Sequence, residues 1–432
     1  MQIYFDTENL PEIFFQASIF LIVYIIFYKR YIYSVLDPLF IYILTISFSS
    51  VLVINTLGET EPVYAFHFFL CHLFFFLGFS LITHKSKSIV KKSSIYFHDF
   101  VTFRIILYIL CSWYFLTNFF LFYVTGFALL SDDPSVGKIN VMRNFGGIYF
   151  INTCISSFIL TGLFFSLFFK PKFVDFLLLL ACIIISSLTG SKGAFVQITG
   201  IVILVANQLL FRHNSKIVLV LRLTAPIGIA GIFIVAFSVL LKENIDSEQA
   251  TLTFVKRLLY GADSTLFFYQ PVNEQYFAQF RFWQYPGYLF NQILAFFKLV
   301  APQEAHGNTM IYNVLHNDPT ISLGPNTPYY IEGQIYFGYY GAFIYSAFIG
   351  ACYAFCREKF LNGKFYSAFS FVLVGCIANQ ASAFPVEASF GITTIFHTCF
   401  YIIPMYIVVN LIIHKKIVWR KIRIKRSFSN YT

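Results

Sequence analysis

Eleven apolar runs constrain the fold of this chain more than any other feature, because each is long enough as a helix to cross roughly 30 Å of hydrocarbon. Only 12% of the residues are charged, against about 25% in soluble domains. The sequence therefore predicts an all-α, polytopic integral membrane protein with about 11 transmembrane helices, in a range of 10–12 because the sixth run is short. The runs are Ile13–Tyr28, Leu36–Leu57, Val63–Thr83, Val101–Thr125, Gly147–Phe169, Phe173–Leu188, Ala194–Phe211, Ile217–Leu241, Ile335–Cys356, Phe365–Ala383 and Ile392–Ile413.

Charges between the runs predict the orientation. With the C-terminal tail HKKIVWRKIRIKR in the cytoplasm and eleven crossings, the N-terminus is external. This arrangement places 22 of the 30 lysines and arginines on the cytoplasmic side, which is the positive-inside pattern of membrane proteins. Only four acids share that side: Asp37, Asp99, Asp175 and Glu358. The net charge of +10 therefore reflects membrane orientation and does not indicate a nucleic-acid partner.

Four parts follow along the chain: transmembrane helices 1–8 in residues 1–241, a large external loop in 242–334, helices 9–11 in 335–413, and a basic cytoplasmic tail in 414–432. Within the loop, a serine N-cap at Ser247 and a stop at Gly261 predict an amphipathic helix. Residues 289–300 predict a second helix that lies on the bilayer. We expect the loop to form a lid of short helices and turns.

Few charges fall inside the predicted spans. Arg104 and Arg222 lie near the start of theirs, and we expect both to reach the cytoplasmic face by snorkelling. The acids that flank the spans lie near cytoplasmic ends, whereas a proton- or sodium-coupled carrier would want carboxylates near the middle of the bilayer. This distribution argues against a transporter.

Eight external cations oppose the positive-inside preference. Arginine and lysine close to the outer membrane surface suit an anionic headgroup such as a lipid pyrophosphate, which arginine can bind through two hydrogen bonds. The alternative is that they are solvated or anchor lipid phosphates. The four that the sequence favours as pyrophosphate ligands are Arg143, Lys192, Arg257 and Arg281.

A proton acceptor is the second requirement for group transfer. His306, beside Glu304, has a side chain that can take a hydroxyl proton near neutral pH, and Glu332 lies just outside the ninth span. Glu387 is a third, weaker candidate, and each of these side chains could instead be merely solvated. The sequence holds no HExxH, Walker, GxSxG or paired DxD motif, so we expect no metal and no nucleotide cofactor.

The segment GPNTPYYIEGQIYFGYYG, residues 324–341, resembles the region where bacterial O-antigen polymerases of the Wzy type close their large periplasmic loop. The residues GFALLSDDP to VMRNFGG resemble the family's earlier periplasmic loop, and TGSKGAF resembles its short basic turn. The family's usual glutamate after glycine is Gln334 here, with Glu332 two residues earlier. The matching positions in the first segment are Pro325 or Pro328, Gly333, Tyr336, Gly338 and Gly341.

The resemblance implies a GT-C-like, metal-independent glycosyltransferase of the bacterial inner membrane. Its substrates would be undecaprenyl-pyrophosphate-linked oligosaccharides, and it would transfer the growing glycan to the non-reducing end of a lipid-linked repeat unit at the periplasmic face. His306 or Glu332 would take the acceptor proton, and the four cations would bind the pyrophosphate. The resemblance also implies a polysaccharide chain-length regulator as a partner. An O-antigen ligase, a lipid-linked oligosaccharide flippase and an acyltransferase remain as alternatives.

Overall fold

Every regular element that the structure describes is a helix. The computed structural model describes residues 10–34, 37–83, 97–128, 134–189, 194–212, 214, 217, 259–296, 298–301, 303–316 and 325–429. The elements are α1 (Leu10–Tyr28), α2 (Pro38–Thr60), α3 (Pro62–Ile82), α4 (Phe100–Thr125), α5 (Pro134–Phe169), α6 (Phe173–Leu188), α7 (Ala194–Asn207), η2 (Tyr260–Ala262), α10 (Asp263–Phe268), α11 (Pro271–Phe277), η3 (Phe282–Gln284), α12 (Tyr285–Phe296), α13 (His306–Leu315), α14 (Tyr329–Leu361), α15 (Ala368–Gln380), η4 (Ala381–Ala383) and α16 (Ala388–Ser429).

Seven of the described helices are long and apolar enough to cross a membrane, namely α1 to α5, α14 and α16. The all-helical class predicted from the sequence is therefore confirmed for the described residues, and these helices support the predicted polytopic membrane character. Three shorter apolar segments correspond to predicted spans as well: Phe173–Leu188, Gln197–Asn207 and Ala368–Ala383. The predicted span Ile217–Leu241 and the predicted helix after Ser247 fall outside the described residues, apart from isolated positions, so the count of eleven stays a prediction.

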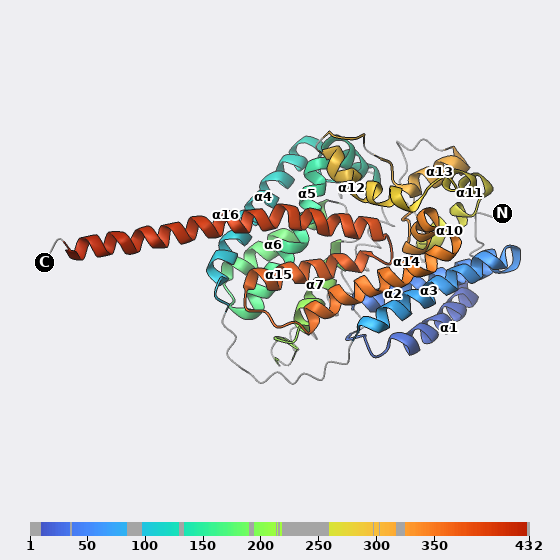
Figure 1. Cartoon of the computed structure of the whole chain (residues 1–432), viewed down its shortest axis with the longest axis horizontal. Coiled ribbons are helices and arrows are strands. Elements are labelled where there is room, and N and C mark those ends of the chain that lie inside the picture. The colour runs from blue at the N-terminus through green and yellow to red at the C-terminus, as the bar shows by residue number, and fades with distance from the viewer. Residues whose placement is uncertain are drawn as a thin grey trace.

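The described helices pack around two apolar cores. One core joins α1, α2 and α3 to α14 and to the short helices of the long loop. The other joins α4 to α7 with α15 and α16. Figure 1 shows the two groups side by side, with α12 crossing above α16 and with α16 continuing beyond the bundle to the C-terminus.

Helices α3 and α14 pack closely, with their backbones in contact at two glycines. A Cβ atom on Gly78 would lie 1.8 Å from the carbonyl oxygen of Ala347. A Cβ atom on Gly350 would lie 2.1 Å from the carbonyl oxygen of Phe75. Small residues allow such approach, and van der Waals packing is a main source of helix association within a membrane.

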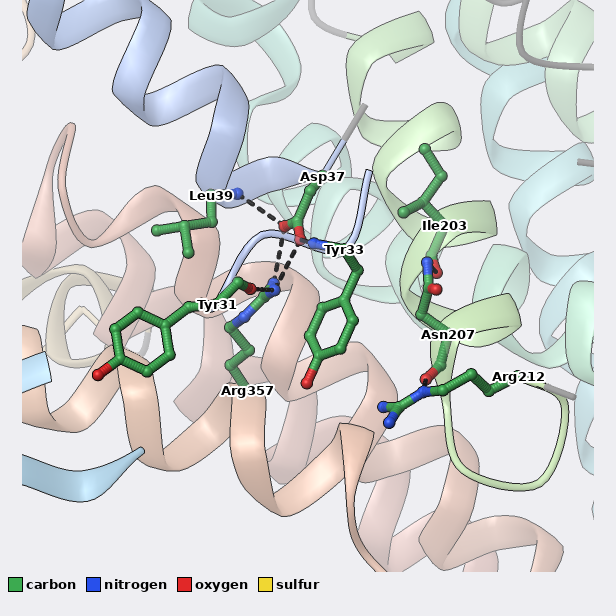
Figure 2. Close-up of polar contacts among 8 residues, drawn as sticks. All are labelled: Tyr31, Tyr33, Asp37, Leu39, Ile203, Asn207, Arg212 and Arg357. Atoms are coloured by element: carbon green, nitrogen blue, oxygen red, sulfur yellow. Dashed lines mark hydrogen bonds and ion pairs between the residues drawn. The ribbon is translucent and has the colours of Figure 1, made fainter. Parts of the chain in front are cut away.

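Two buried ion pairs in the described part of the chain join helix ends that the sequence analysis assigned to the cytoplasmic side. The prediction that Arg104 snorkels to the surface is wrong: its side chain is buried and pairs with Asp175, 2.7 Å away. Burial is possible because Asp175 and Ser166 supply the acceptors that water would otherwise provide. Arg222 lies outside the described residues. A second pair, Arg357 with Asp37, fastens the far end of α14 to the start of α2 (Figure 2).

Helix α14 is broken at Gly338, whose φ of 74° and ψ of 178° are not helical. The residues before the break form a half-helix, 329–337, which turns back alongside the next turns of α14. A Cβ atom on Gly333 would lie 3.0 Å from the Cα of Ala342, so the two parts are in contact. The sequence predicted a turn-rich lid up to Gln334; the structure instead has helix from Tyr329, because the turn formers end at Pro328.

The half-helix begins inside the bundle. The hydroxyl of Tyr329 bonds to the imidazole Nδ1 of His72, which lies halfway along α3. Beyond the break, the Tyr339 hydroxyl donates to the carbonyl of Val63, at the start of α3. We call this end of the bundle the Gly338 end, and the opposite one the Arg357 end. The half-helix therefore rises from the middle of the bundle to the Gly338 end.

Candidate functional site

A cavity of about 830 Å³ lies at the break in α14. Residues of α11, η3 and α12 form one wall, and residues on both sides of Gly338 form the other. Its lining is mostly aromatic and aliphatic, with one arginine, one glutamine and three tyrosines. The lining residues are Phe277, Ala278, Phe280, Arg281, Phe282, Tyr285, Gln334, Ile335, Tyr336, Phe337, Gly338, Gly341, Ile344, Tyr345 and Phe348.

The cavity borders the face of α14 that would contact lipid. Ile344 and Phe348 lie on the span after the break and are 74% and 58% exposed. Exposed aliphatic and aromatic side chains on a transmembrane helix are the surface that hydrocarbon chains cover. A molecule dissolved in the bilayer could therefore reach the cavity sideways, without crossing water.

Glu332 lies behind the cavity wall and is fully buried. The half-helix carries it to the first turn of α16, where the backbone N–H of Ser389 donates to both carboxylate oxygens, at 3.1 and 3.2 Å. The hydroxyl of Tyr345 donates to Oε2 at 3.0 Å. The positive end of the α16 dipole and hydrogen bonds from these two donors thus stabilise a negative charge on a carboxylate that is buried away from water.

Two tyrosine hydroxyls connect Glu332 to the cavity. Tyr345 is hydrogen-bonded to Glu332, and its hydroxyl is also hydrogen-bonded to the hydroxyl of Tyr285. Both rings line the cavity. Glu332 itself has no exposed surface, so any molecule in the cavity meets the carboxylate through these two hydroxyls.

His306 lies behind a neighbouring part of the same wall. It is the first residue of α13 and is buried, and its Nε2 lies 2.8 Å from the hydroxyl of Tyr336, which lines the cavity. Its ring stacks on Tyr288 at 4.2 Å between centroids, and the rings of Phe277 and Phe280 pack edgewise around it. Burial lowers the pKa of His306 to about 3, because the charged imidazolium would lose its hydration.

Arg281 supplies a positive charge at the edge of the cavity. Its Nη1 donates to the carbonyls of Ala278 and Phe280, which holds the guanidinium against the turn before η3. Among the described residues, no carboxylate forms an ion pair with it. The guanidinium is exposed and keeps other N–H groups for an anion.

Of the six side chains proposed from the sequence, the structure brings Arg281, His306 and Glu332 to one cavity. Lys192 and Arg257 lie outside the described residues, and the side chain of Arg143, in α5, is not described either. Glu387 lies just before α16, near Glu332; burial first, and then the charge of Glu332, raise its pKa to about 8. His316 lies at the end of α13 and is exposed.

The sequence did not single out Tyr285 and Tyr345. The chain has 29 tyrosines, and no local pattern separates these two from the rest. The only available signal was their position, one in an aromatic stretch of the long loop and one shortly after a glycine break.

In the part of the chain that the structure describes, no group of three or more histidine, cysteine, aspartate or glutamate residues is arranged to hold a metal ion. The polar side chains described in the lining of the cavity are an arginine, a glutamine and three tyrosines, and a buried carboxylate and a buried imidazole lie behind its wall. Comparison of the chain with protein-family models, with curated proteins and with solved structures finds no match.

Proposed function

We propose that the chain is a polyprenyl-pyrophosphate-dependent glycosyltransferase that polymerises lipid-linked repeat units of a surface polysaccharide. It would act at the periplasmic face of the bacterial inner membrane and would move the growing glycan from undecaprenyl pyrophosphate to the non-reducing end of a lipid-linked repeat unit. The Gly338 end would then face the periplasm. This orientation agrees with the distribution of lysine and arginine along the sequence.

One observation carries the proposal: the cavity combines a lipid-facing apolar wall, an arginine without a carboxylate partner among the described residues, and a buried carboxylate reached through hydroxyls. A lipid pyrophosphate has the matching parts. Its isoprenoid chain would lie along Ile344 and Phe348, and its pyrophosphate would meet Arg281. The aromatic rings of the wall offer flat apolar faces for sugar rings.

The reaction needs the charge that develops on the leaving pyrophosphate to be stabilised and the acceptor hydroxyl to lose its proton. Arg281 is placed for the first task, since a charge-assisted hydrogen bond is typically worth about 1.5–3 kcal/mol. The second task falls to the groups behind the wall, Glu332 and His306. A polysaccharide chain-length regulator would act as a partner of this enzyme.

The test is a lipopolysaccharide gel from cells in which this gene is deleted and then restored. Wild type is expected to restore a ladder of bands, and the deletion to leave a single band of core plus one repeat unit. Core alone would instead indicate a ligase, a flippase or an earlier step, and an unchanged ladder would rule out any role in this pathway.

Arg281→Ala tests the site in the same cells. We expect short or absent ladders with Arg281→Ala and full ladders with Lys298→Ala. Lys298 is an exposed cation on the segment after α12 that does not line the cavity. Equal ladders from both variants would remove Arg281 from the site while leaving the polymerase function standing.

A further inference from the structure

We infer that Tyr285 is the catalytic residue that contacts the acceptor hydroxyl, and that the proton leaves through Tyr345 to Glu332. The inference rests on the proposed function, since it assigns the proton path of that same reaction. It also assigns different roles to the two buried candidates, Glu332 and His306.

The direction of the path follows from counting hydrogens. A tyrosine hydroxyl has one proton to donate and lone pairs to accept with. The hydroxyl of Tyr345 donates its proton to Glu332 at 3.0 Å. It therefore has none left for Tyr285, and the hydroxyl of Tyr285 must be the donor in the bond between the two tyrosines. The oxygen of Tyr285 keeps a lone pair, and its ring lines the cavity.

Glu332 is built to receive the proton. Its carboxylate accepts from the backbone of Ser389 and from Tyr345, and no cation pairs with it in the described part of the chain. A bound cation would favour the charged form and oppose protonation. Hydrogen bonds and the α16 dipole alone stabilise the ionised form of this carboxylate, and these bonds can persist in part when one oxygen is protonated.

His306 is less suited to that role. A proton on its imidazole would place a positive charge among Tyr288, Phe277 and Phe280, away from water. The lowered pKa agrees with this cost. We assign His306 as a positioning residue, which as a neutral ring fixes the hydroxyl of Tyr336 at 2.8 Å and thereby the adjoining wall of the cavity.

The transfer step balances as follows. The acceptor oxygen forms a bond to the anomeric carbon of the donor glycan, and the bond from that carbon to the pyrophosphate oxygen breaks. The electron pair leaves with the pyrophosphate, beside Arg281. The acceptor proton passes to the Tyr285 oxygen, the Tyr285 proton to the Tyr345 oxygen, and the Tyr345 proton to Glu332. Glu332 returns its proton to solvent or to the released pyrophosphate.

The experiment uses the full-length protein in lipid nanodiscs with an undecaprenyl-pyrophosphate-linked repeat unit as the substrate. Tyr285→Phe keeps the ring and removes the hydroxyl at the end of the path. We expect kcat to fall by about 10²–10⁴, the usual range for loss of general acid–base catalysis, with little change in KM. Glu332→Gln should lower kcat similarly and abolish the decline of kcat towards acid pH.

Tyr312→Phe is the matched control. Tyr312 lies in α13, is 48% exposed and does not line the cavity. We expect Tyr312→Phe to retain kcat within about threefold, and His306→Gln to lose less than Tyr285→Phe, because only loss of the base is expected to cost 10² or more. A Tyr285→Phe enzyme as active as the control would overturn the path, as would a larger loss from His306→Gln than from Glu332→Gln.

Two further readouts keep the outcomes separate. If the wild-type enzyme forms no polymer from this substrate, the proposed function fails. If the wild type forms polymer and Tyr285→Phe is equally active, only the proton path is refuted. Should Tyr285→Phe not accumulate, fluorotyrosine at position 285 preserves the ring and hydroxyl while lowering the proton affinity. The path requires that this substitution change kcat or its pH profile, and an unchanged profile would contradict it.

Discussion

The guanidinium of Arg357 contacts both carboxylate oxygens of Asp37, at 2.8 and 2.6 Å, although the two residues are 320 positions apart in the chain. Both side chains are buried, and the same guanidinium donates to the carbonyl of Tyr31 and lies 5.2 Å from the ring centroid of Tyr33 (Figure 2). Asp37 also caps the first turn of α2 by accepting from the backbone N–H of Leu39. One ion pair therefore joins the loop after α1, the start of α2 and the end of α14.

Removing one member of this pair should destabilise the protein strongly, because it leaves the other charge buried without a partner. Arg357→Met or Asp37→Asn is expected to cost about 3–5 kcal/mol. The double variant Asp37→Asn with Arg357→Met should be less destabilised than the sum of the single ones. Thermal unfolding in detergent measures this, with Lys359→Ala, an exposed cation two residues away, as the control. Additive losses would mean that the two side chains do not stabilise each other.

The contact between α3 and α14 gives a second prediction. In Gly350→Ala the new methyl group would collide with the backbone carbonyl of Phe75, which cannot rotate away as a side chain could. Overpacking of this kind typically costs about 1–3 kcal/mol. Gly146→Ala, where the added Cβ would meet open space, is the control and should leave the unfolding temperature unchanged or slightly higher. Equal unfolding temperatures for the two variants would show that α3 and α14 can move apart without loss of stability.

The sequence was sufficient for properties that depend on composition over twenty residues, and insufficient for those that depend on a partner far along the chain. Apolar runs predicted the long helices, and the predicted helix at 289–300 is close to α12. Arg104 was misplaced because its acceptors, Asp175 and Ser166, are more than sixty residues away. The half-helix before Gly338 was missed because its depth depends on contacts with α3 rather than on its own residues.

The candidate site shows the same difference between what the sequence could predict and what it could not. The sequence singled out Arg281, His306 and Glu332 because charged side chains and histidines are rare in this chain, so that each one is conspicuous. Tyrosines are not rare, and the roles proposed for Tyr285 and Tyr345 depend on which hydroxyls meet in space. The sequence could list the charges near a site but could not supply the connections between them.

Glu387 predicts a pH dependence of stability. Its pKa in the folded protein is about 8, against an ordinary value of 4.5, so between these values the folded state binds a proton that the unfolded chain has released. Stability should therefore fall as the pH rises from about 4.5 to about 8. Unfolding temperatures of wild type and Glu387→Gln across this window measure the effect, since other titrating groups cancel in the difference. If the difference between the two unfolding temperatures does not change with pH, the pKa of Glu387 is not raised in the folded protein.

The break at Gly338 predicts a loss of activity that exceeds the loss of stability. Its φ of 74° with ψ of 178° belongs to a region that is essentially restricted to glycine, so Gly338→Ala should cost about 1–3 kcal/mol through backbone strain alone. No neighbouring atom would clash with the added Cβ, so the expected loss of stability comes from the backbone conformation and not from a steric clash. A chain relieved of this strain would straighten towards continuous helix and would draw the half-helix, with Glu332, away from Ser389 and from the cavity.

Polymer formation and thermal unfolding should both be measured for Gly338→Ala, with Gly287→Ala as the control. Gly287 lies in α12 at the same end of the bundle, and an added Cβ there would also meet open space, but its φ is not in the left-handed region. We expect Gly287→Ala to retain both properties and Gly338→Ala to lose polymer formation while most of the protein remains folded at the growth temperature. A Gly338→Ala enzyme with normal polymers would mean that the break does not position Glu332 for the reaction.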